Sequence, residues 1–260
     1  MRAHHAVIVI PCFNEAARLV PEALLALLDD DGVELQLVDD GSTDDTRARL
    51  RDLAARAPGR VTVLELDRNH GKGEAVRRGL ERALLDGAKL VGYLDADGST
   101  PPAEMLRLLR VVAERPDIDV VLASRVRLLG RHIERHPVRH YLGRMFATAA
   151  SLSLGLAVYD TQCGAKAFRR TPALLAALRE PFSSRWVFDV ELLRRLLDGD
   201  GDAPGLAPQA FIELPLKEWR DVHGTKLDAA AMARAGAEIA WLALRGTAKR
   251  RRRGRAHRRS

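Results

Sequence analysis

The stretch LVGYLDADGSTPPAEM, residues 90–105, decides the fold class of this chain. An apolar run ends in Asp95-Ala96-Asp97, and two prolines then open a segment with helical periodicity. Side chains two positions apart on an extended chain point to the same side, so we expect the carboxylates of Asp95 and Asp97 to face one site. The stretch therefore predicts a buried strand that ends at an acidic site and leads into a helix.

The same alternation of strand and helix patterns continues on both sides of this stretch. Strands are expected at residues 6–10, 34–38, 61–66, 90–94 and 119–123. Helices are expected at residues 21–28, 43–57, 73–85 and 102–115. Alternating strands and helices favour a right-handed parallel sheet with its site at the carboxyl ends of the strands. The pattern predicts an α/β fold with a Rossmann-like, mostly parallel sheet flanked by helices.

The second half of the chain has a different pattern. After about residue 124, longer helical segments are broken by glycine and proline, with one further strand expected at 210–216. Because no linker rich in Pro, Gly and Ser separates the halves, we expect one domain over residues 1–228. A C-terminal helix is expected at 229–248, followed by a disordered basic tail at 249–260.

Composition and charge exclude several classes of protein. With 47% hydrophobic and 30% charged residues over 260 positions, the chain is an ordinary globular protein. The net charge of +7 lies in the tail, because the last twelve residues carry eight Lys or Arg and no acidic residue. Cys12 and Cys163 are too few for a disulfide scaffold and match no zinc spacing. No apolar run is long enough for a signal peptide or a membrane span, so we expect a cytoplasmic protein.

Two pairs of aspartates carry the chemistry of the first half. Mg²⁺ or Mn²⁺ takes oxygen ligands from one or two acidic side chains together with substrate phosphates, and Asp95 and Asp97 match that need. A solvated turn is the alternative for this D-x-D triplet. Asp39 and Asp40 end another predicted strand, where they can accept hydrogen bonds from a nucleotide base or ribose. A capped strand–turn–helix connection is the alternative there.

Phosphate-binding loops of other enzyme classes are absent from the sequence. Gly71-Lys72-Gly73 opens a predicted helix but is too short for a GxxxxGK[ST] loop, and no GxGxxG occurs. This argues against ATPases and dehydrogenases.

In this order, and together with VIVIPCFNEAARL at residues 7–19, these segments resemble the inverting glycosyltransferases of family 2, which have the GT-A nucleotide-sugar fold. The resemblance implies a nucleotide-sugar half at about 6–123 and an acceptor half at about 124–228. It also implies that Asp95 and Asp97 hold ribose and the metal. The other donor-binding residues that it implies are Pro11, Asn14, Glu15, Asp39, Asp40 and Lys72.

Three segments of the second half narrow the resemblance. They are YDTQCGAKAFRR at 159–170, RWVFDVELLRR at 185–195 and EWRDVHGTKL at 218–227. They look like the polyprenyl-phosphate sugar transferase branch, above all dolichyl-phosphate β-glucosyltransferases. The resemblance implies transfer of a hexose, with glucose favoured, from UDP-glucose to a polyprenyl phosphate.

The acceptor side follows from the chemistry of a lipid phosphate. Its oxygen is already anionic near neutral pH, so the reaction needs cations that position it more than it needs a strong base. We expect Asp97, Arg125 and Asp189 to be catalytic, although a helix N-terminal acid such as Asp189 is also a good dipole partner. Acceptor contacts are expected from Ser124, Arg125, Arg131, Gln162 and Glu191. Closure over the donor diphosphate is expected from Arg220, His223 and Lys226.

Other readings of the sequence stay open. One is a family 2 transferase that uses GDP-mannose or a non-lipid acceptor, and another is a non-catalytic nucleic-acid or membrane binding protein. Basic patches without interleaved aromatic residues argue against specific nucleic-acid binding. We expect the tail at 249–260 to hold the protein as a peripheral protein on the anionic inner face of the membrane, and a merely solvated tail is the alternative.

Overall fold

A computed structural model describes residues 5–133, 147–185, 187–201 and 203–221. The expected C-terminal helix at 229–248, the basic tail at 249–260, and the predicted donor residues His223 and Lys226 lie outside the described residues.

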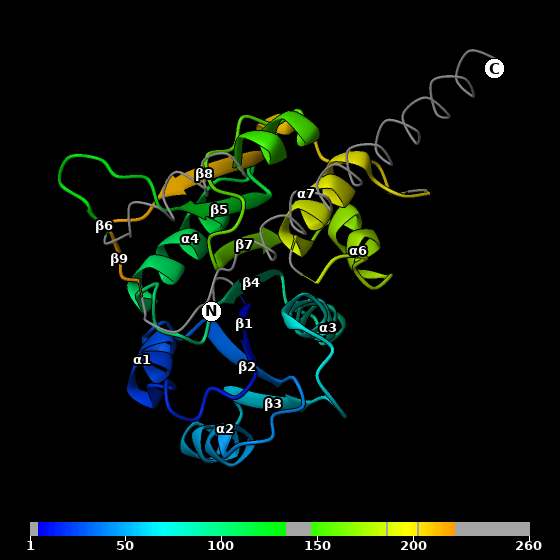
Figure 1. The fold of residues 1–260 in the computed structure, drawn as a ribbon. Coiled ribbons are helices and arrows are strands. Elements are labelled where there is room, and N and C mark those ends of the chain that lie inside the picture. The colour runs from blue at the N-terminus through cyan, green and yellow to red at the C-terminus, as the bar shows by residue number, and fades with distance from the viewer. Residues whose placement is uncertain (1–4, 134–146, 186, 202, 222–260) are drawn as a thin grey trace.

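One seven-stranded sheet runs through the described part of the protein (Figure 1). Its strands are β1 (Ala6–Cys12), β2 (Val33–Asp39), β3 (Val61–Glu65), β4 (Leu90–Leu94), β5 (Val120–Ser124), β7 (Ala165–Arg169) and β8 (Phe211–Pro215). Their order is β3-β2-β1-β4-β7-β5-β8, and every neighbouring pair is parallel except those of β7. The prediction of an α/β fold with a mostly parallel sheet is confirmed.

Strand β7 was not expected from the sequence. It runs antiparallel between β4 and β5, with Ala165 opposite Leu94 and Phe168 opposite Val120. The second half was expected to be helical before residue 210, because AKAFR is short and lacks the β-branched residues that usually mark a strand. Its neighbours on both sides determine its conformation.

Helices cover both faces of the sheet. They are α1 (Pro21–Leu25), the 3₁₀ turn η1 (Ala26–Asp29), α2 (Thr46–Arg56), α3 (Lys72–Leu85), α4 (Pro102–Glu114), α6 (Pro172–Leu178) and α7 (Phe188–Asp198), with a second 3₁₀ turn η2 (Pro208–Ala210) and helical residues 147–154. The starts of α4 and α6 show why the sequence folds this way, since each has proline in its first turn and Thr171 caps α6 through a bond from the Leu174 N–H.

Two hydrophobic cores lie on the two faces of the sheet. Val7 and Val9 of β1 point into a core shared with α3, α6 and α7, whereas Ile8 and Ile10 point into a core shared with α1, α2 and α4. Figure 1 shows the same division, with these two sets of helices on opposite sides of the strands. Both faces being covered explains why the strands are continuous apolar runs.

The order of the strands places a ligand site. The chain passes from β1 to β2 and β3 on one side and then returns to β4 on the other side of β1. Ligands of open α/β sheets bind at such a switch point, outside the carboxyl ends of the strands. Here those ends are followed by residues 13–15 after β1 and by Asp95–Asp97 after β4.

A small second sheet lies outside the main one. It pairs β6 (His132–Ile133) with β9 (Glu218–Trp219) in parallel. None of the helices in the described part of the chain has the length and hydrophobicity needed to span a bilayer.

Candidate active site

The predicted donor residues meet at one edge of the sheet. Strands β1, β2 and β4 are parallel and end there, and the antiparallel strand β7 begins there. The backbone N–H of Asp95 donates to the carbonyl of Gly164 at 2.9 Å, which joins the end of β4 to the segment before β7. The D-x-D segment and the D-T-Q-C-G segment, far apart in the sequence, therefore lie side by side.

Three carboxylates share this edge, and the pKa values of two of them, Glu15 and Asp95, are raised. The pKa of Glu15 is raised mainly by burial, and the charges of Asp97 and Asp95 add to this, while Arg18 opposes it. The pKa of Asp95 is also raised, first by burial and then by Asp97, with Lys72 opposing. We call Glu15, Asp95 and Asp97 the acidic centre. Negative charge held partly out of water in this way favours a cationic ligand.

Lys72 pairs with Asp95 of the acidic centre, and Arg18 pairs with Glu15. Lys72 is the first residue of α3, and its Nζ lies 2.6 Å from Asp95 Oδ1. Loss of water around the ammonium lowers its pKa, but the charges of Asp95 and Asp189 outweigh this and leave the pKa above its ordinary value. Lys72 is therefore charged at neutral pH and placed where a diphosphate would bring its own negative charge.

The acidic centre fits the divalent cation that the sequence predicts. No group of three or more His, Cys, Asp and Glu side chains in the described ranges can hold a metal by itself. Mg²⁺ and Mn²⁺ commonly use one or two carboxylates and take their remaining ligands from phosphate and water, and Asp95 with Asp97 matches that share. In addition, Glu15 Oε2 is buried and has no hydrogen-bond partner among the described residues, so an acceptor oxygen remains available beside them.

The loop after β2 contacts the loop after β1. Asn14 accepts a bond from the Thr43 N–H at 2.9 Å and donates its own backbone N–H to Ser42 Oγ at 3.1 Å. Its φ of 53° is left-handed, a conformation that asparagine tolerates better than most residues. Gly41 is also left-handed, and a Cβ there would lie 2.3 Å from the carbonyl carbon of Arg68.

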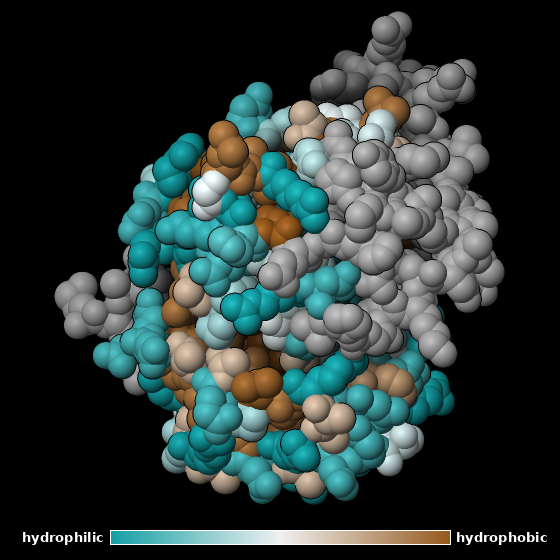
Figure 2. All heavy atoms as spheres, turned by 60° about the vertical axis from the view of Figure 1, so that its left-hand side comes forward, coloured by the Kyte–Doolittle hydropathy of each residue, from teal (hydrophilic) through white to brown (hydrophobic). Residues whose placement is uncertain are grey.

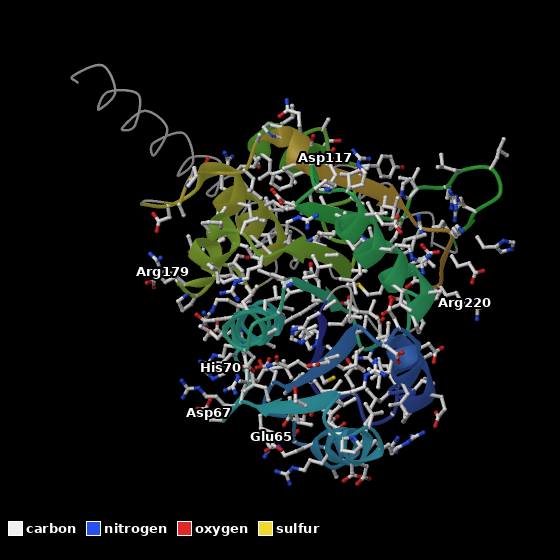
Figure 3. All side chains as sticks on the ribbon, turned by 180° about the vertical axis from the view of Figure 1, so that it is seen from behind. Glu65, Asp67, His70, Asp117, Arg179 and Arg220 are labelled. Carbon is white, nitrogen blue, oxygen red and sulfur yellow. The ribbon has the colours of Figure 1, made fainter. Side chains whose placement is uncertain are left out.

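Asp39 and Asp40 are engaged inside the protein. Asp39 pairs with Arg47 Nε at 2.7 Å and accepts the Ser42 N–H at 3.0 Å. The carboxylate of Asp40 accepts from the N–H groups of His70 and Gly71, both at 2.8 Å, and from Asn69 Nδ2 at 3.1 Å. Asp40 thus fixes the loop that presents Lys72, and Figure 3 shows His70 in this loop at the start of α3. Direct contact of either aspartate with the nucleotide stays a prediction.

Pro11, another predicted donor residue, lies within β1, opposite Val38.

A buried polar cluster lies behind the acidic centre. The Nζ of Lys166 donates to Tyr93 Oη at 2.7 Å, to Asp189 Oδ1 at 2.8 Å and to the Cys163 carbonyl at 2.8 Å. The Tyr93 hydroxyl also donates to Asp189. Lys166 and Tyr93 are fully buried. Sequence reasoning missed both, although a lysine inside the run from Ala165 to Phe168 is a signal, since a buried ammonium needs a partner.

This cluster contains Asp189, whose expected catalytic role stays a prediction. Only 5% of the residue is exposed, and its contacts are with Lys166 and Tyr93 rather than with solvent at the open edge. Glu191 also has a structural role. Its carboxylate accepts the N–H groups of Ser183 and Ser184, at 2.8 and 3.2 Å, and pairs with Arg195 at 2.6 Å. Glu191 therefore stabilises the turn before α7, and its expected acceptor contact stays a prediction.

Two of the predicted acceptor residues, Arg125 and Gln162, contact Asp160. Arg125 makes a bidentate ion pair with it, Nε to Oδ2 at 2.6 Å and Nη2 to Oδ1 at 2.8 Å, and packs 5.3 Å from the ring centre of Trp219. Burial lowers the pKa of Arg125, but Asp160 outweighs this and Asp95 adds to the rise. Gln162 donates its N–H to Asp160 Oδ1 at 3.2 Å. Asp160, which the sequence analysis did not single out, therefore organises this side of the site.

The remaining predicted residues lie around the same edge. Ser124 is buried at the end of β5, opposite Pro215 of β8. Arg220 donates its backbone N–H to the Ser99 carbonyl at 3.0 Å, while the Ser99 N–H donates to Asp97 at 2.9 Å. The backbone of Arg220 therefore lies beside the loop after β4, and donor contact by its side chain stays a prediction. Figure 3 shows its side chain pointing outward after β9. Arg131 lies in the loop between β5 and β6, where its N–H donates to the Leu128 carbonyl at 3.1 Å.

Comparisons with known proteins agree with this fold and site. The family described as "Glycosyl transferase family 2" matches residues 7–174. The chain belongs to glycosyltransferase family 2 and is therefore a glycosyltransferase.

Individual relatives and solved structures extend over more of the chain. It is 33% identical to the dolichyl-phosphate beta-glucosyltransferase of Drosophila melanogaster over 85% of this chain and 68% of that protein. It is 28% identical to the polyprenol monophosphomannose synthase of Mycolicibacterium smegmatis over 92% of this chain and 87% of that protein. A crystal structure of glucosyl-3-phosphoglycerate synthase from Mycobacterium tuberculosis with UDP superposes with a TM-score of 0.66 at 21% identity, covering 94% and 80% of the two chains. At that identity, the superposition supports the fold alone, which is the GT-A fold.

Proposed function

We propose that this protein transfers a hexose, with glucose favoured, from UDP-glucose to a polyprenyl phosphate with inversion at the anomeric carbon. The observation that carries the proposal is the juxtaposition of two charged groups at one sheet edge. Lys72 with Asp95 forms the donor side, and Arg125 with Asp160 forms the acceptor side, close enough for Asp95 to raise the pKa of Arg125. The relatives named above support the choice of substrates, because their names specify a dolichyl phosphate or polyprenol product.

Donor binding uses the acidic centre and Lys72. Asp95 and Asp97 would hold Mg²⁺ or Mn²⁺ on the diphosphate, and the ion when bound supplies positive charge to the leaving group. A solved structure of the mycobacterial glucosyl-3-phosphoglycerate synthase contains Mn²⁺ and UDP-glucose. Lys72, at the start of α3 and paired with Asp95, would bring its ammonium to the diphosphate oxygens. Arg220, held beside Ser99, adds a further positive charge on the donor side.

The transfer step needs no proton. An oxygen of the acceptor phosphate, already anionic, forms a bond to the anomeric carbon, and the bond from that carbon to the diphosphate oxygen breaks with its electron pair leaving on UDP. Arg125, aided by Ser124, Gln162 and Arg131, positions the acceptor phosphate for in-line attack. Asp189 acts as a positioning residue, since its pair with Lys166 supports the wall of the site behind Asp95 and Lys72.

A transferase that uses GDP-mannose or a non-lipid acceptor is the competing proposal. Similarity to the polyprenol monophosphomannose synthase supports the mannose alternative. Membership of a transferase family sets aside a non-catalytic nucleic-acid or membrane binding protein. We further propose residues 1–228 as the catalytic domain, and a peripheral position on the cytoplasmic face of the membrane with the tail at 249–260 on anionic lipid.

One experiment tests the substrates directly. Purified full-length chain is incubated with Mn²⁺ and radiolabelled UDP-glucose or GDP-mannose, each with a polyprenyl phosphate, with 3-phosphoglycerate or without acceptor. We expect label in the lipid fraction only with UDP-glucose and the polyprenyl phosphate. Transfer from GDP-mannose, or to 3-phosphoglycerate in preference to the lipid, would establish the competing proposal.

A further inference from the structure

The loop that joins β5 to β6 exposes an apolar tip. Leu128 is 47% exposed and Leu129 is fully exposed, at 104%. The Arg131 N–H donates to the Leu128 carbonyl at 3.1 Å and Gly130 has a φ of +75°, so residues 128–131 form a tight turn with the features of a type II turn. Leu129 occupies the outer corner of this turn. In Figure 1 the loop projects from the body of the molecule.

Positive side chains surround this tip. Arg127 is exposed, Arg131 is partly exposed, and Lys217 is exposed at the base of the loop, where its carbonyl accepts the His132 N–H at 2.8 Å. Glu218 is the acidic side chain on the paired strands β6 and β9. Figure 2 brings this side of the molecule forward and shows separate brown, hydrophobic surfaces on a largely teal, hydrophilic face. Apolar side chains flanked by arginine and lysine match the chemistry of an anionic bilayer surface.

The base of the loop is fixed to the acceptor side of the site. Ile133 of β6 is buried, and Trp219 of β9 packs on Arg125, which is itself held by Asp160. The four residue steps from Arg125 to Leu129 span at most about 14 Å. Each headgroup layer of a bilayer is about 5–8 Å thick. A tip that reaches the acyl chains therefore leaves Arg125 near the level of the lipid phosphates.

We propose that the loop at residues 126–131 inserts Leu128 and Leu129 into an anionic lipid bilayer, with Arg127 and Arg131 among the headgroup phosphates. Insertion turns the acceptor side of the site toward the membrane and presents Arg125 to the phosphate of a lipid acceptor. The purpose of this arrangement rests on the proposed function, but insertion itself is measurable without any sugar transfer.

A fluorescent probe at the tip tests insertion in the full chain. The only two native cysteines, Cys12 and Cys163, are buried, and burial raises the pKa of both thiols, so an introduced surface cysteine is labelled selectively. Leu129→Cys and, as the matched control, Leu85→Cys are labelled with an environment-sensitive dye. Leu85 is also an exposed leucine, at 74%, but ends α3 away from this loop.

Vesicles of about three parts phosphatidylcholine to one part phosphatidylglycerol provide the anionic surface. We expect a blue shift of the probe at position 129 and its quenching by lipids brominated on their acyl chains, with neither effect at position 85. If the protein sediments with the vesicles but the probe at position 129 keeps the emission that it has in water, the protein docks through another segment, such as the basic tail. That result would overturn the proposal. Failure of the protein to sediment would overturn it as well.

Kinetics provide the second readout. Replacing Leu128 and Leu129 together by serine should raise KM for a long-chain polyprenyl phosphate in vesicles by about tenfold, because two leucines lose their apolar environment. The KM for a short, water-soluble prenyl phosphate should not change, and an equal rise for both acceptors would contradict insertion. If the unmodified protein transfers sugar to neither acceptor, the proposed function fails, and the probe at position 129 still decides whether the loop inserts.

Discussion

Gly164 lies directly against the carboxylate of Asp95, since a Cβ at position 164 would stand 2.0 Å from Asp95 Oδ2. The Gly164 carbonyl also accepts the Asp95 N–H at 2.9 Å. A side chain at position 164 would therefore force the Asp95 carboxylate to move. The D-T-Q-C-G segment therefore borders a carboxylate of the predicted donor site.

Gly164→Ala should remove sugar transfer while leaving the protein folded. The added methyl group displaces the Asp95 carboxylate, which weakens binding of Mn²⁺ with UDP, whereas the cores on both faces of the sheet are untouched. Calorimetric titration of UDP with Mn²⁺ measures this loss. Gly59→Ala is the control for binding, because a Cβ at position 59 meets no atom within 4 Å, while the left-handed φ of +78° there affects stability alone. If Gly164→Ala binds UDP with Mn²⁺ as tightly as the unmodified protein, position 164 does not control the Asp95 carboxylate.

Lys166→Met should destabilise the protein strongly. It leaves the Asp189 carboxylate buried without its cation, which typically costs about 3–5 kcal/mol of unfolding free energy. Adding Asp189→Leu should restore part of this loss, because the unpaired charge is then removed. Urea denaturation of the single and double variants measures both effects, with the exposed Lys89→Met as control. Equal stability of Lys166→Met and Lys89→Met would contradict the buried pair.

Glu15→Gln should gain stability relative to the unmodified protein as pH rises. The pKa of Glu15 is above its ordinary value of 4.5, first because burial removes water from the carboxylate and then because Asp97 and Asp95 repel it. The folded state therefore holds this proton more tightly than the unfolded state, and stability falls as pH rises through 4.5 toward the higher folded pKa. Glutamine does not titrate and avoids this loss.

Urea denaturation at pH 4 and at pH 7 compares the two proteins. The difference in unfolding free energy between Glu15→Gln and the unmodified protein should shift in favour of glutamine at the higher pH. A difference that does not vary with pH would show that the carboxylate is not repelled in the folded state.

The first half of the fold was predictable because its signals are local. Each of the five expected strands there is a short apolar run closed by polar residues, and the aspartates at 39, 40, 95 and 97 mark the strand ends. Helix boundaries were less accurate. The helix expected at 43–57 begins at Thr46, because Asp44 first accepts the Thr46 N–H in a turn. The helix expected at 21–28 is α-helical only to Leu25 and continues as a 3₁₀ turn over Ala26–Asp29.

The second half depends on contacts that no local pattern contains. Strand β7 is stabilised by β4 and β5 on either side. Its Lys166 can be buried because Tyr93 and Asp189 accept hydrogen bonds from the ammonium group. The ion pair of Asp189 was not predicted for the same reason, because its partner Lys166 lies on a different element of the fold. The ion pair between Arg125 and Asp160 likewise could not be predicted from the sequence, because the two residues are 35 positions apart.

Asp97→Asn should abolish sugar transfer and leave stability nearly unchanged. The asparagine oxygen still accepts the Ser99 N–H, which Asp97 does at 2.9 Å, but the anionic ligand of the metal is lost. Asp30→Asn is a matched control, because Asp30 accepts the Gly32 N–H at 2.9 Å with the same two-residue spacing, on the exposed loop before β2. Turnover with varied Mn²⁺ distinguishes the two. Normal turnover of Asp97→Asn would remove Asp97 from the metal site.

Arg125→Ala should weaken binding of the lipid acceptor far more than binding of the nucleotide sugar. Loss of one charge-assisted phosphate contact costs about 1.5–3 kcal/mol, so KM for the polyprenyl phosphate should rise by one to two orders of magnitude. The substitution also leaves the Asp160 carboxylate without its bidentate partner, so the protein should lose stability as well. Assays are therefore run well below the melting temperature of the variant, with Asp160→Asn beside it, which loses the ion pair but keeps the arginine. If both variants raise the two KM values equally, Arg125 serves only to pair with Asp160. A selective rise for the lipid in Arg125→Ala alone places its guanidinium on the acceptor phosphate.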